Sequence, residues 1–331
     1  MEAANTLRIG VATPKTIAKT AALALACVLV TLATHTRPAH AETNDRFLPN
    51  DFTLALPGRG EPSFVTFEML IAEGSASDVA ARAALVRQQM LAYFPGAVPV
   101  AEGEVSAQYL LKRYRWVDTH PTWAYTAAGK PAGLIGDAGA VQAAAESWGT
   151  LGANVRFTDA GTTTATPDAC QGVTDGRNTV GWHSLPGNVL AMTCTNWSPS
   201  TGATEFDIQV DPNWAWTTEA SFIRMDLQSV FTHEFGHALG IDHPCDINQV
   251  ATCTTTDRNA VMYGGYAGGT NKRAQQPDDI AGLIAAYGAT PGTDARASTT
   301  PTRPVPAAAQ SPLPLTPGLT YRAAIVGLTR D

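Results

Sequence analysis

The sequence predicts an α+β fold, and three observations on residues 137–288 indicate it. Short segments alternate apolar and polar residues, as half-buried strands do. A helix with an apolar stripe is expected at 227–239. The region then closes on a second helix of this kind, which ends at Gly288.

The first expected helix covers residues 137–148, which are rich in alanine and begin with Asp137 as an N-cap. Four strand-like segments follow it; they span residues 154–158, 179–182, 188–193 and 205–211. In the last segment Phe206, Ile208 and Val210 alternate with polar residues, so one face of that strand should be buried. These elements would supply the sheet and a helix that packs on it.

The final helix is expected to begin at Pro277, because proline suits the first helical position. Asp278 and Asp279 follow in the first turn, where carboxylates interact favourably with the helix dipole. Apolar residues then recur at i, i+3, i+4 and i+7; they are Ile280, Leu283, Ile284 and Tyr287. Gly288 supplies the cap that ends this helix.

Residues 233–243 read HEFGHALGIDH, a pattern that indicates a metal centre. His233 and His237 lie one turn apart on the same helix face, so both imidazoles can reach one ion. Gly240 ends the helix because glycine takes the left-handed conformation at little cost, and the turn can bring His243 to the same ion. Three protein ligands leave a fourth position open for water, as in catalytic rather than structural zinc sites.

Glu234 stands one position round the helix from His233, where a carboxylate can act on a water at the metal without being a ligand. The other side of this helix is apolar; its stripe consists of Leu227, Phe231, Phe235 and Leu239. Two other interpretations stay open: surface histidines at this spacing by chance, and a metal site that has lost turnover. Chance does not explain the third histidine together with the glycine, and an inactive relic usually loses the base that Glu234 would supply.

The first 41 residues have the three parts of a secretory signal peptide. A positive region with Arg8, Lys15 and Lys19 precedes an apolar run at 21–33. The A-x-A pattern that ends at Ala41 predicts cleavage after that residue and a secreted, extracellular chain. The apolar run is too short to span a bilayer comfortably, and an uncleaved anchor is the alternative.

Four cysteines remain after the predicted cleavage, and an even number in a secreted chain predicts two disulfides. They are Cys170, Cys194, Cys245 and Cys253. Sequence order favours pairing the first with the second and the third with the fourth, so that each bond closes a local loop. The two other pairings, free thiols and a second metal site remain alternatives.

Removal of residues 1–41 takes away four basic residues and one acidic residue, which changes the formal charge from −7 to −10. An acidic chain without a basic run argues against nucleic acids and anionic membranes as partners. We therefore expect no nucleic-acid partner and no stable membrane insertion. We also expect a monomer.

Two further segments flank the predicted domain. Residues 42–108 contain an apolar segment at 64–70 and a helical pattern at 77–94, but no residue of the metal motif. We interpret 42–108 as a pro-segment, with an accessory N-terminal region as the alternative. Residues 290–331 hold seven prolines by residue 318, so we expect a Pro-rich, disordered tail.

Residues 109–289 resemble the metzincin zinc peptidases, and within that clan they most resemble the matrixins. The resemblance is carried by HEFGHALGIDH and by AVMY at 260–263, which is similar to the Met-turn of the clan. Further matches are YRW at 114–116, NTVGW at 178–182 and the terminal DDIAGLIAAYG. The resemblance implies a twisted, mostly parallel sheet with an antiparallel edge strand, an active-site helix and a C-terminal helix.

The resemblance also implies roles for single residues. The implied zinc ligands are His233, His237 and His243. Glu234 is the implied general base, and Met262 would form an apolar floor beneath the metal. Leu190 and Ala191 would belong to an edge strand that an extended peptide joins by backbone hydrogen bonds. Tyr266 would wall the pocket for the side chain after the scissile bond.

From this resemblance we expect a secreted zinc endopeptidase that hydrolyses protein or peptide substrates by means of metal-activated water. Calcium is a further implied ion, although no ligands for it can be assigned. The rival interpretation is a catalytically inactive, metal-binding adhesion or binding protein that is secreted and keeps the metzincin fold.

The chain departs from the family in four features. One is that Pro244 follows His243, which is more similar to the serralysins. Residues 42–108 contain no cysteine, so the cysteine that holds the zinc in mammalian-type pro-segments is missing. Outside the motif the mature chain has only His120 and His183, which argues against a second, structural zinc. Eighteen residues separate His243 from Met262, a longer interval than is usual in matrixins; a loop closed by the second cysteine pair would account for it.

Overall fold

The computed structural model describes residues 51–290, apart from 59, 73–75, 101–110, 188 and 246–252. The predicted signal peptide at 1–41 and, apart from Thr290, the predicted tail at 290–331 lie outside the described residues. Among the described helices, none combines the length and the apolar character that crossing a membrane requires.

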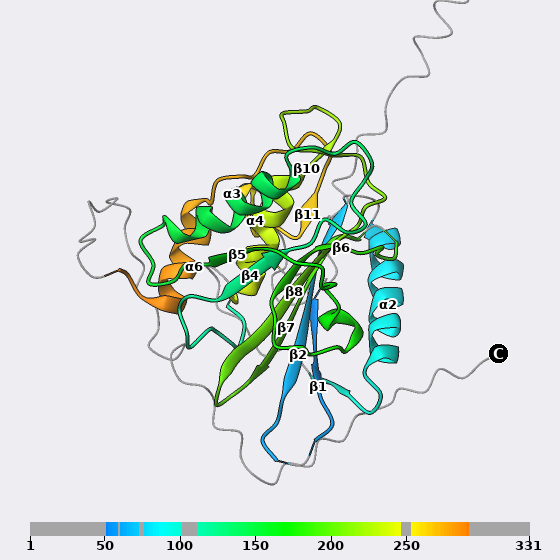
Figure 1. Ribbon diagram of the computed structural model, residues 1–331, viewed down its shortest axis with the longest axis vertical. Helices are drawn as coiled ribbons and strands as arrows, with labels where there is room; N and C mark the ends of the chain where they lie inside the picture. The colour runs from blue at the N-terminus through cyan, green and yellow to red at the C-terminus, as the bar shows by residue number, and fades with distance from the viewer. Residues whose placement is uncertain are drawn as a thin grey trace, which may run out of the picture. The chain divides into compact units, whose positions relative to one another are not determined.

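A mixed sheet with the strand order β3-β1-β2-β7-β8-β6-β4-β5 forms the centre of the described region (Figure 1), and β11 also pairs with β2. Its strands are β1 (Asp51–Ala55), β2 (Phe64–Ala72), β3 (Val98–Val100), β4 (Thr122–Tyr125), β5 (Thr158–Thr162), β6 (Thr179–Trp182), β7 (Val189–Ser198), β8 (Gly202–Val210) and β11 (Gly265–Tyr266). A separate small ladder joins β9 (Trp216–Thr217) to β10 (Met225–Asp226).

The predicted α+β architecture is confirmed. Strands β8, β6, β4 and β5 are parallel neighbours, and β7 pairs with β8 in the antiparallel sense. The sheet does not end at β7, however, because β2 from the N-terminal region pairs with its other side. Strands β1, β2 and β3 of the N-terminal region therefore extend the sheet.

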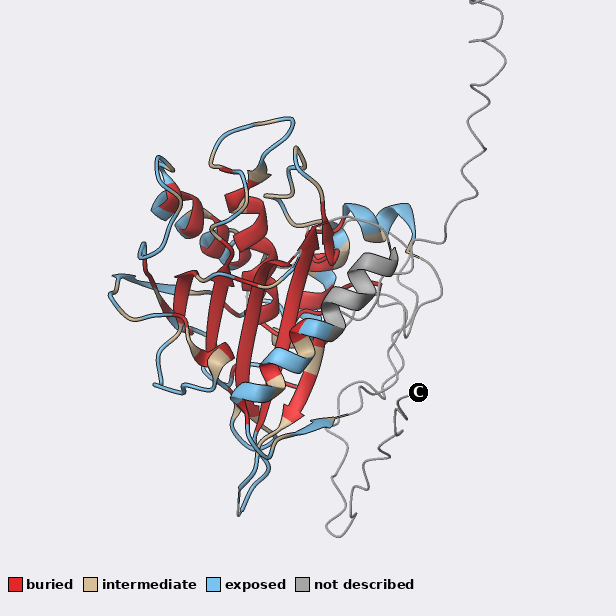
Figure 2. Cartoon of the chain, turned by 90° about the vertical axis from the view of Figure 1, so that its right-hand side faces the viewer, coloured by how far each residue is buried: buried red, intermediate tan, exposed pale blue. Residues whose placement is uncertain are grey.

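Helices cover both faces of this sheet (Figures 1 and 2). They are α2 (Ala76–Tyr93), α3 (Asp137–Gly149), α4 (Leu227–Ala238), α5 (Thr255–Asn259) and α6 (Pro277–Tyr287). Helices α3 and α4 share one apolar core with residues of β2, β7 and β8, such as Leu70, Leu190 and Ile208. Helix α2 contributes Val86 and Met90 to a second core on the opposite face.

Helix α4 forms where the sequence predicted a helix at 227–239. Its N-cap is Asp226, whose side chain accepts a hydrogen bond from the Ser229 N–H at 2.8 Å. Gly240 follows the helix with φ of 79°, and a Cβ there would lie 2.6 Å from the Tyr114 carbonyl oxygen. Glycine is therefore required both by the left-handed turn and by the close approach of the chain.

Two sequence predictions about elements are wrong. The N-cap of α3 is Gly136, not Asp137; the Asp137 carboxylate is buried and accepts from the Tyr125 hydroxyl and the Lys130 ammonium, each at 2.7 Å. The strand expected at 154–158 begins only at Thr158 and runs to Thr162. The backbone just before it bonds to other loops: the Asn154 N–H donates to Gly288 and the Arg156 N–H to Thr119.

Both favoured disulfides are present. Cys170, in the 3₁₀ turn η1 (Ala169–Gln171), is bonded to Cys194 of β7. Cys245 is bonded to Cys253 and closes a short loop after the metal motif. The first bond joins residues 24 apart and ties the loop before β6 to the centre of the sheet.

Candidate metal centre

Three imidazoles converge at the C-terminal end of α4. The Nε2 atom of His237 lies 2.9 Å from that of His233 and 3.1 Å from that of His243, and the third separation is 3.3 Å. Ligands at the usual Zn–N distance on a tetrahedron would be about 3.3 Å apart. The donor set and its spacing therefore fit a zinc ion held by three histidines.

Two of the three rings are oriented by backbone carbonyl oxygens. The Nδ1 atom of His233 lies 2.8 Å from the Val261 oxygen, and that of His237 lies 2.8 Å from the Ile241 oxygen. A proton on each Nδ1 leaves the Nε2 lone pair for a metal, as is usual for metal-binding histidines.

The three imidazole rings differ in their pKa values. Burial, together with the neighbouring histidines, lowers the pKa of His233 and His243 well below the usual value, so both are neutral. Burial also lowers the pKa of His237, but the Glu68 carboxylate more than offsets this and raises it to about 9. A metal ion and a proton therefore compete for His237.

Glu234 lies beside the histidines and is fully buried. The Thr193 hydroxyl of β7 donates to its Oε2 at 2.6 Å, whereas Oε1 has no hydrogen-bond partner among the described residues. Burial raises the pKa of Glu234 to about 8, against the opposing effects of His237 and the Thr193 hydrogen bond. One carboxylate oxygen is thus fixed and the other is available to take a proton.

The turn after α5, which contains Val261 and Met262, contacts the metal centre. Asp279 of α6 accepts hydrogen bonds from the Val261 and Met262 N–H groups at 3.0 and 3.1 Å. Val261 in turn provides the carbonyl that orients His233. Met262 packs against Gly236, between the first two histidines of the motif, where a larger side chain would collide with its sulfur.

The residues expected to bind a peptide lie in one continuous sheet. Leu190 and Ala191 of β7 and Tyr266 of β11 are all buried. Strand β2 lies between them, since Leu70 is in register with Ala191 and Ala72 with Tyr266. The Tyr266 hydroxyl donates to the Thr270 carbonyl at 2.6 Å.

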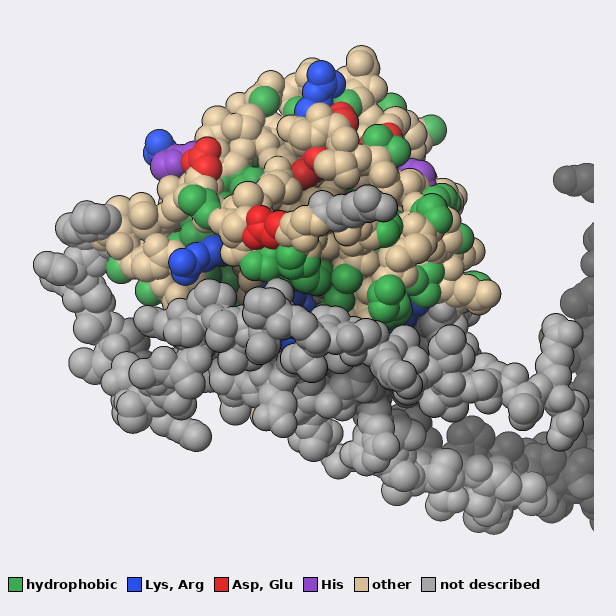
Figure 3. Space-filling model, turned by 90° about the horizontal axis from the view of Figure 1, so that it is seen from below, with side chains coloured by type: hydrophobic (Ala, Val, Ile, Leu, Met, Phe, Trp, Pro, Cys, Tyr) green, Lys and Arg blue, Asp and Glu red, His purple; other side chains and the backbone are tan. Residues whose placement is uncertain are grey.

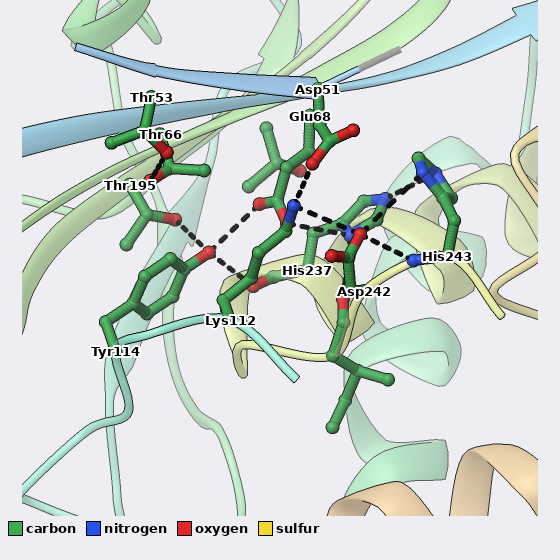
Figure 4. A network of polar contacts seen from close by, with 12 residues as sticks. Asp51, Thr53, Thr66, Glu68, Lys112, Tyr114, Thr195, His237, Asp242 and His243 are labelled. Atoms are coloured by element: carbon green, nitrogen blue, oxygen red, sulfur yellow. Dashed lines mark hydrogen bonds and ion pairs between the residues drawn. The ribbon is translucent and has the colours of Figure 1, made fainter. Parts of the chain in front are cut away.

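A buried polar network lies next to the centre and was not predicted from the sequence (Figure 4). Tyr114 donates from its hydroxyl to Glu68 at 2.9 Å and lies 3.0 Å from the His237 carbonyl oxygen. Lys112 forms ion pairs with Asp51, Glu68 and Asp242. The charged residues of this network are visible in the sequence, and they were the signal from which it could have been predicted. They lie far apart in sequence, however, and only strand pairing brings them together.

The sequence around this site is similar to that of known proteins. The family model for matrixin matches residues 138–288. Residues 138–288 form a matrixin domain. The three histidines, Glu234, Met262 and α6 all lie within this matrixin domain.

Individual relatives of the matrixin domain are similar only over short stretches. Metalloendoproteinase 2-MMP of Arabidopsis thaliana is 32% identical over 120 residues, which are 34% of this chain and 28% of that protein. Human matrilysin is 34% identical over 104 residues, 31% of this chain and 33% of that protein. Metalloendoproteinase 1-MMP of Arabidopsis thaliana is 36% identical over 72 residues, 22% of this chain and 17% of that protein. The chain thus spans a third or less of the length of these curated relatives.

Proposed function

We propose that this protein is a secreted zinc endopeptidase that hydrolyses peptide bonds in proteins. His233, His237 and His243 hold the zinc, and Glu234 is the general base. The observation that carries the proposal is the convergence of three Nε2 atoms within 3.3 Å, next to a buried glutamate, inside a matrixin domain. Zinc is the cofactor that this family implies.

The chain's own residues would move the protons. When bound, zinc would supply a Lewis acid that polarises the scissile carbonyl and makes the attacking water more acidic. Glu234 accepts a proton from that water at Oε1 and passes it to the leaving amine. Thr193 keeps the other carboxylate oxygen in place during both transfers.

The wider organisation belongs to the same proposal. Residues 1–41 are a signal peptide, 42–108 a pro-segment, 109–289 the peptidase domain and 290–331 a tail. The two disulfides support an oxidising, extracellular location. On the part of the face that Figure 3 shows in colour, basic side chains are few and scattered among acidic ones, which favours protein over nucleic acid as the substrate.

Chelator-sensitive proteolysis tests this function. The secreted protein, intact and after limited proteolysis of its N-terminal region, is incubated with casein or gelatin, with and without a chelator. We expect cleavage that the chelator stops and that added zinc restores. Zinc-loaded protein that cleaves neither substrate in either form would favour the binding or adhesion protein instead.

Removal of the third histidine should weaken zinc retention. In the His243→Ala variant two imidazoles remain, and we expect less than about half of the wild-type zinc after dialysis, because a catalytic site needs three protein ligands. Metal analysis of the dialysed protein measures this. His183→Ala, which lies outside the motif, is the control. Unchanged zinc in His243→Ala would remove that residue from the ligand set.

Thr193 should act on turnover by positioning Glu234. Thr193→Val keeps the side-chain shape and removes the hydrogen bond to Oε2, so we expect kcat to fall about tenfold with little change in KM. Thr193→Ser keeps a hydroxyl and should restore most of the rate. Steady-state kinetics on a fluorogenic peptide with the active form measure both variants. Equal loss in the valine and serine variants would show that packing matters and the hydroxyl does not.

A further inference from the structure

Strand β7 has a partner on each side. It pairs with β8 on one side, and on the other with β2 over eight residue pairs, from Phe64↔Trp197 to Ile71↔Val189. Every residue of β2 is buried, as Figure 2 shows for the centre of the sheet. No backbone hydrogen-bonding edge of β7 is therefore open to a second extended chain over this stretch.

We infer that β2 is an internal occupant of the peptide-binding edge of β7 and that it keeps the active site closed to substrates until it is withdrawn. The inference rests on the proposed function, because it takes the β7 edge to be the place where a substrate peptide binds. It assigns the latency of this enzyme to backbone pairing and not to a side chain on the zinc.

The contacts at the histidines favour closure by a strand. Glu68 reaches His237 at Nδ1, with its Oε1 at 3.1 Å, and not at the Nε2 atom that faces the other two rings. Within the described part of the chain, the contacts of the three Nε2 atoms are to one another. Closed protein should therefore still bind zinc.

A buried ion cluster fastens the N-terminal strands to the metal motif (Figure 4). Lys112 lies next to the turn at Gly240, to whose carbonyl its N–H donates at 2.9 Å. Its ammonium pairs with Asp51 of β1, lies 3.6 Å from Glu68 of β2 and lies 3.0 Å from Asp242. All four side chains are at most 10% exposed, so these pairs are poorly screened by water.

Withdrawal of β1 and β2 would leave the cluster's remaining groups paired. Lys112 keeps Asp242 when Asp51 and Glu68 depart. Tyr114 keeps contacts with Thr195 and the His237 carbonyl, and the Nδ1 atom of His237 keeps the Ile241 carbonyl. The departure of β1 and β2 therefore leaves no unpaired charge of this cluster in the peptidase domain. This is the condition for a reversible lock.

The side chains of β2 also indicate what could take its place. Phe67 and Met69 pack against Met192 and its neighbours on the α2 face, whereas Leu70 packs into the core on the α4 face. An incoming strand would present its side chains to the same two faces, because neighbours along a strand alternate. We expect extended peptides with apolar residues on both faces to bind there.

A disulfide lock tests the inference in the full chain. Residues 102–107 are replaced by the recognition sequence of a site-specific protease to give the parent protein. The locked variant adds Thr66→Cys and Thr195→Cys, two residues in register between β2 and β7. Thr66→Cys alone and Thr195→Cys alone are the matched controls. Mass spectrometry verifies the cut and the new bond.

Two readouts are compared before and after the cut. The first is hydrolysis of a fluorogenic peptide, which should rise at least tenfold in the parent and single variants and stay at its uncut level in the locked variant. The second is the fluorescence anisotropy of a labelled peptide with the sequence of residues 62–73 and a solubilising lysine tail. That peptide should bind the cut parent, and neither the uncut parent nor the locked variant should bind it; a scrambled peptide is its control.

The two readouts separate the inference from the function it rests on. Peptide binding that appears only after the cut, without any hydrolysis by zinc-loaded protein, would support the strand lock and contradict the endopeptidase. Uncut parent that already hydrolyses or binds peptide as well as the cut form would overturn the lock. A locked variant whose peptide hydrolysis and peptide binding rise after the cut as much as in the single variants would also overturn the lock.

Discussion

Replacement of Glu234 by alanine is expected to lower kcat/KM for peptide cleavage by about 10²–10⁴-fold, the range that a general base contributes. The carboxylate is fully buried, and its Oε1 has no other hydrogen-bond partner among the described residues. The Glu68 carboxylate does not take the same place, because its Oε1 lies 3.1 Å from the Nδ1 atom of His237. The variant should therefore lose proton transfer and little else.

Zinc content makes this prediction specific to catalysis. His233 and His237 do not depend on Glu234 for their orienting hydrogen bonds, which go to Val261 and Ile241. Glu234→Ala should thus retain about one zinc per chain after dialysis. Glu146→Ala, at an exposed position on α3, is the matched control and should keep wild-type activity. Wild-type rates in Glu234→Ala would remove this residue from the role of base.

Replacement of Trp148 by alanine is expected to lower the free energy of unfolding by about 3–5 kcal/mol, the usual cost of truncating a buried large aromatic side chain. Trp148 of α3 is fully buried, and its Nε1 donates to the Thr232 carbonyl of α4 at 2.8 Å. Its ring also lies against Gly236, where a Cβ would be 2.7 Å away. The indole therefore holds the metal-bearing helix against α3.

Denaturant unfolding with both disulfides intact measures this loss. Trp214 is only partly buried, and its Nε1 bond to the Val189 carbonyl is longer at 3.3 Å, so Trp214→Ala should cost clearly less. Trp148→Ala should also retain zinc less well, because the positions of His233 and His237 depend on that helix. A loss below about 1 kcal/mol would mean that α4 is held in place by other contacts.

The parts of the site that depend on local sequence could be predicted. Helix period and glycine conformation place His233, His237 and the turn at Gly240, and the structure brings His243 to the same point. Pro277, Asp278 and Asp279 at the start of α6 and Gly288 at its end predicted that helix from local sequence as well. Each of these features involves residues within about three helical turns of one another.

The partner of β7 could not be predicted, because strand pairing between residues far apart leaves no periodic mark in either strand. The apolar run at 64–70 is compatible with several buried positions, and only the structure places it against β7. The Thr193 hydrogen bond to Glu234 depends on the same register of the sheet. The N-cap error at Asp137 has a local cause: its carboxylate bonds to Tyr125 and Lys130 instead of to a helix N–H.

The most direct test of the account is the coordination of zinc in the intact, zinc-loaded chain, measured by X-ray absorption spectroscopy. Three imidazole nitrogens and one further oxygen, all at about 2.0–2.1 Å, are expected, and one imidazole fewer in any zinc that His243→Ala retains. A sulfur scatterer at about 2.3 Å, a fourth imidazole, or failure to take up zinc would contradict a three-histidine centre with one position open for chemistry.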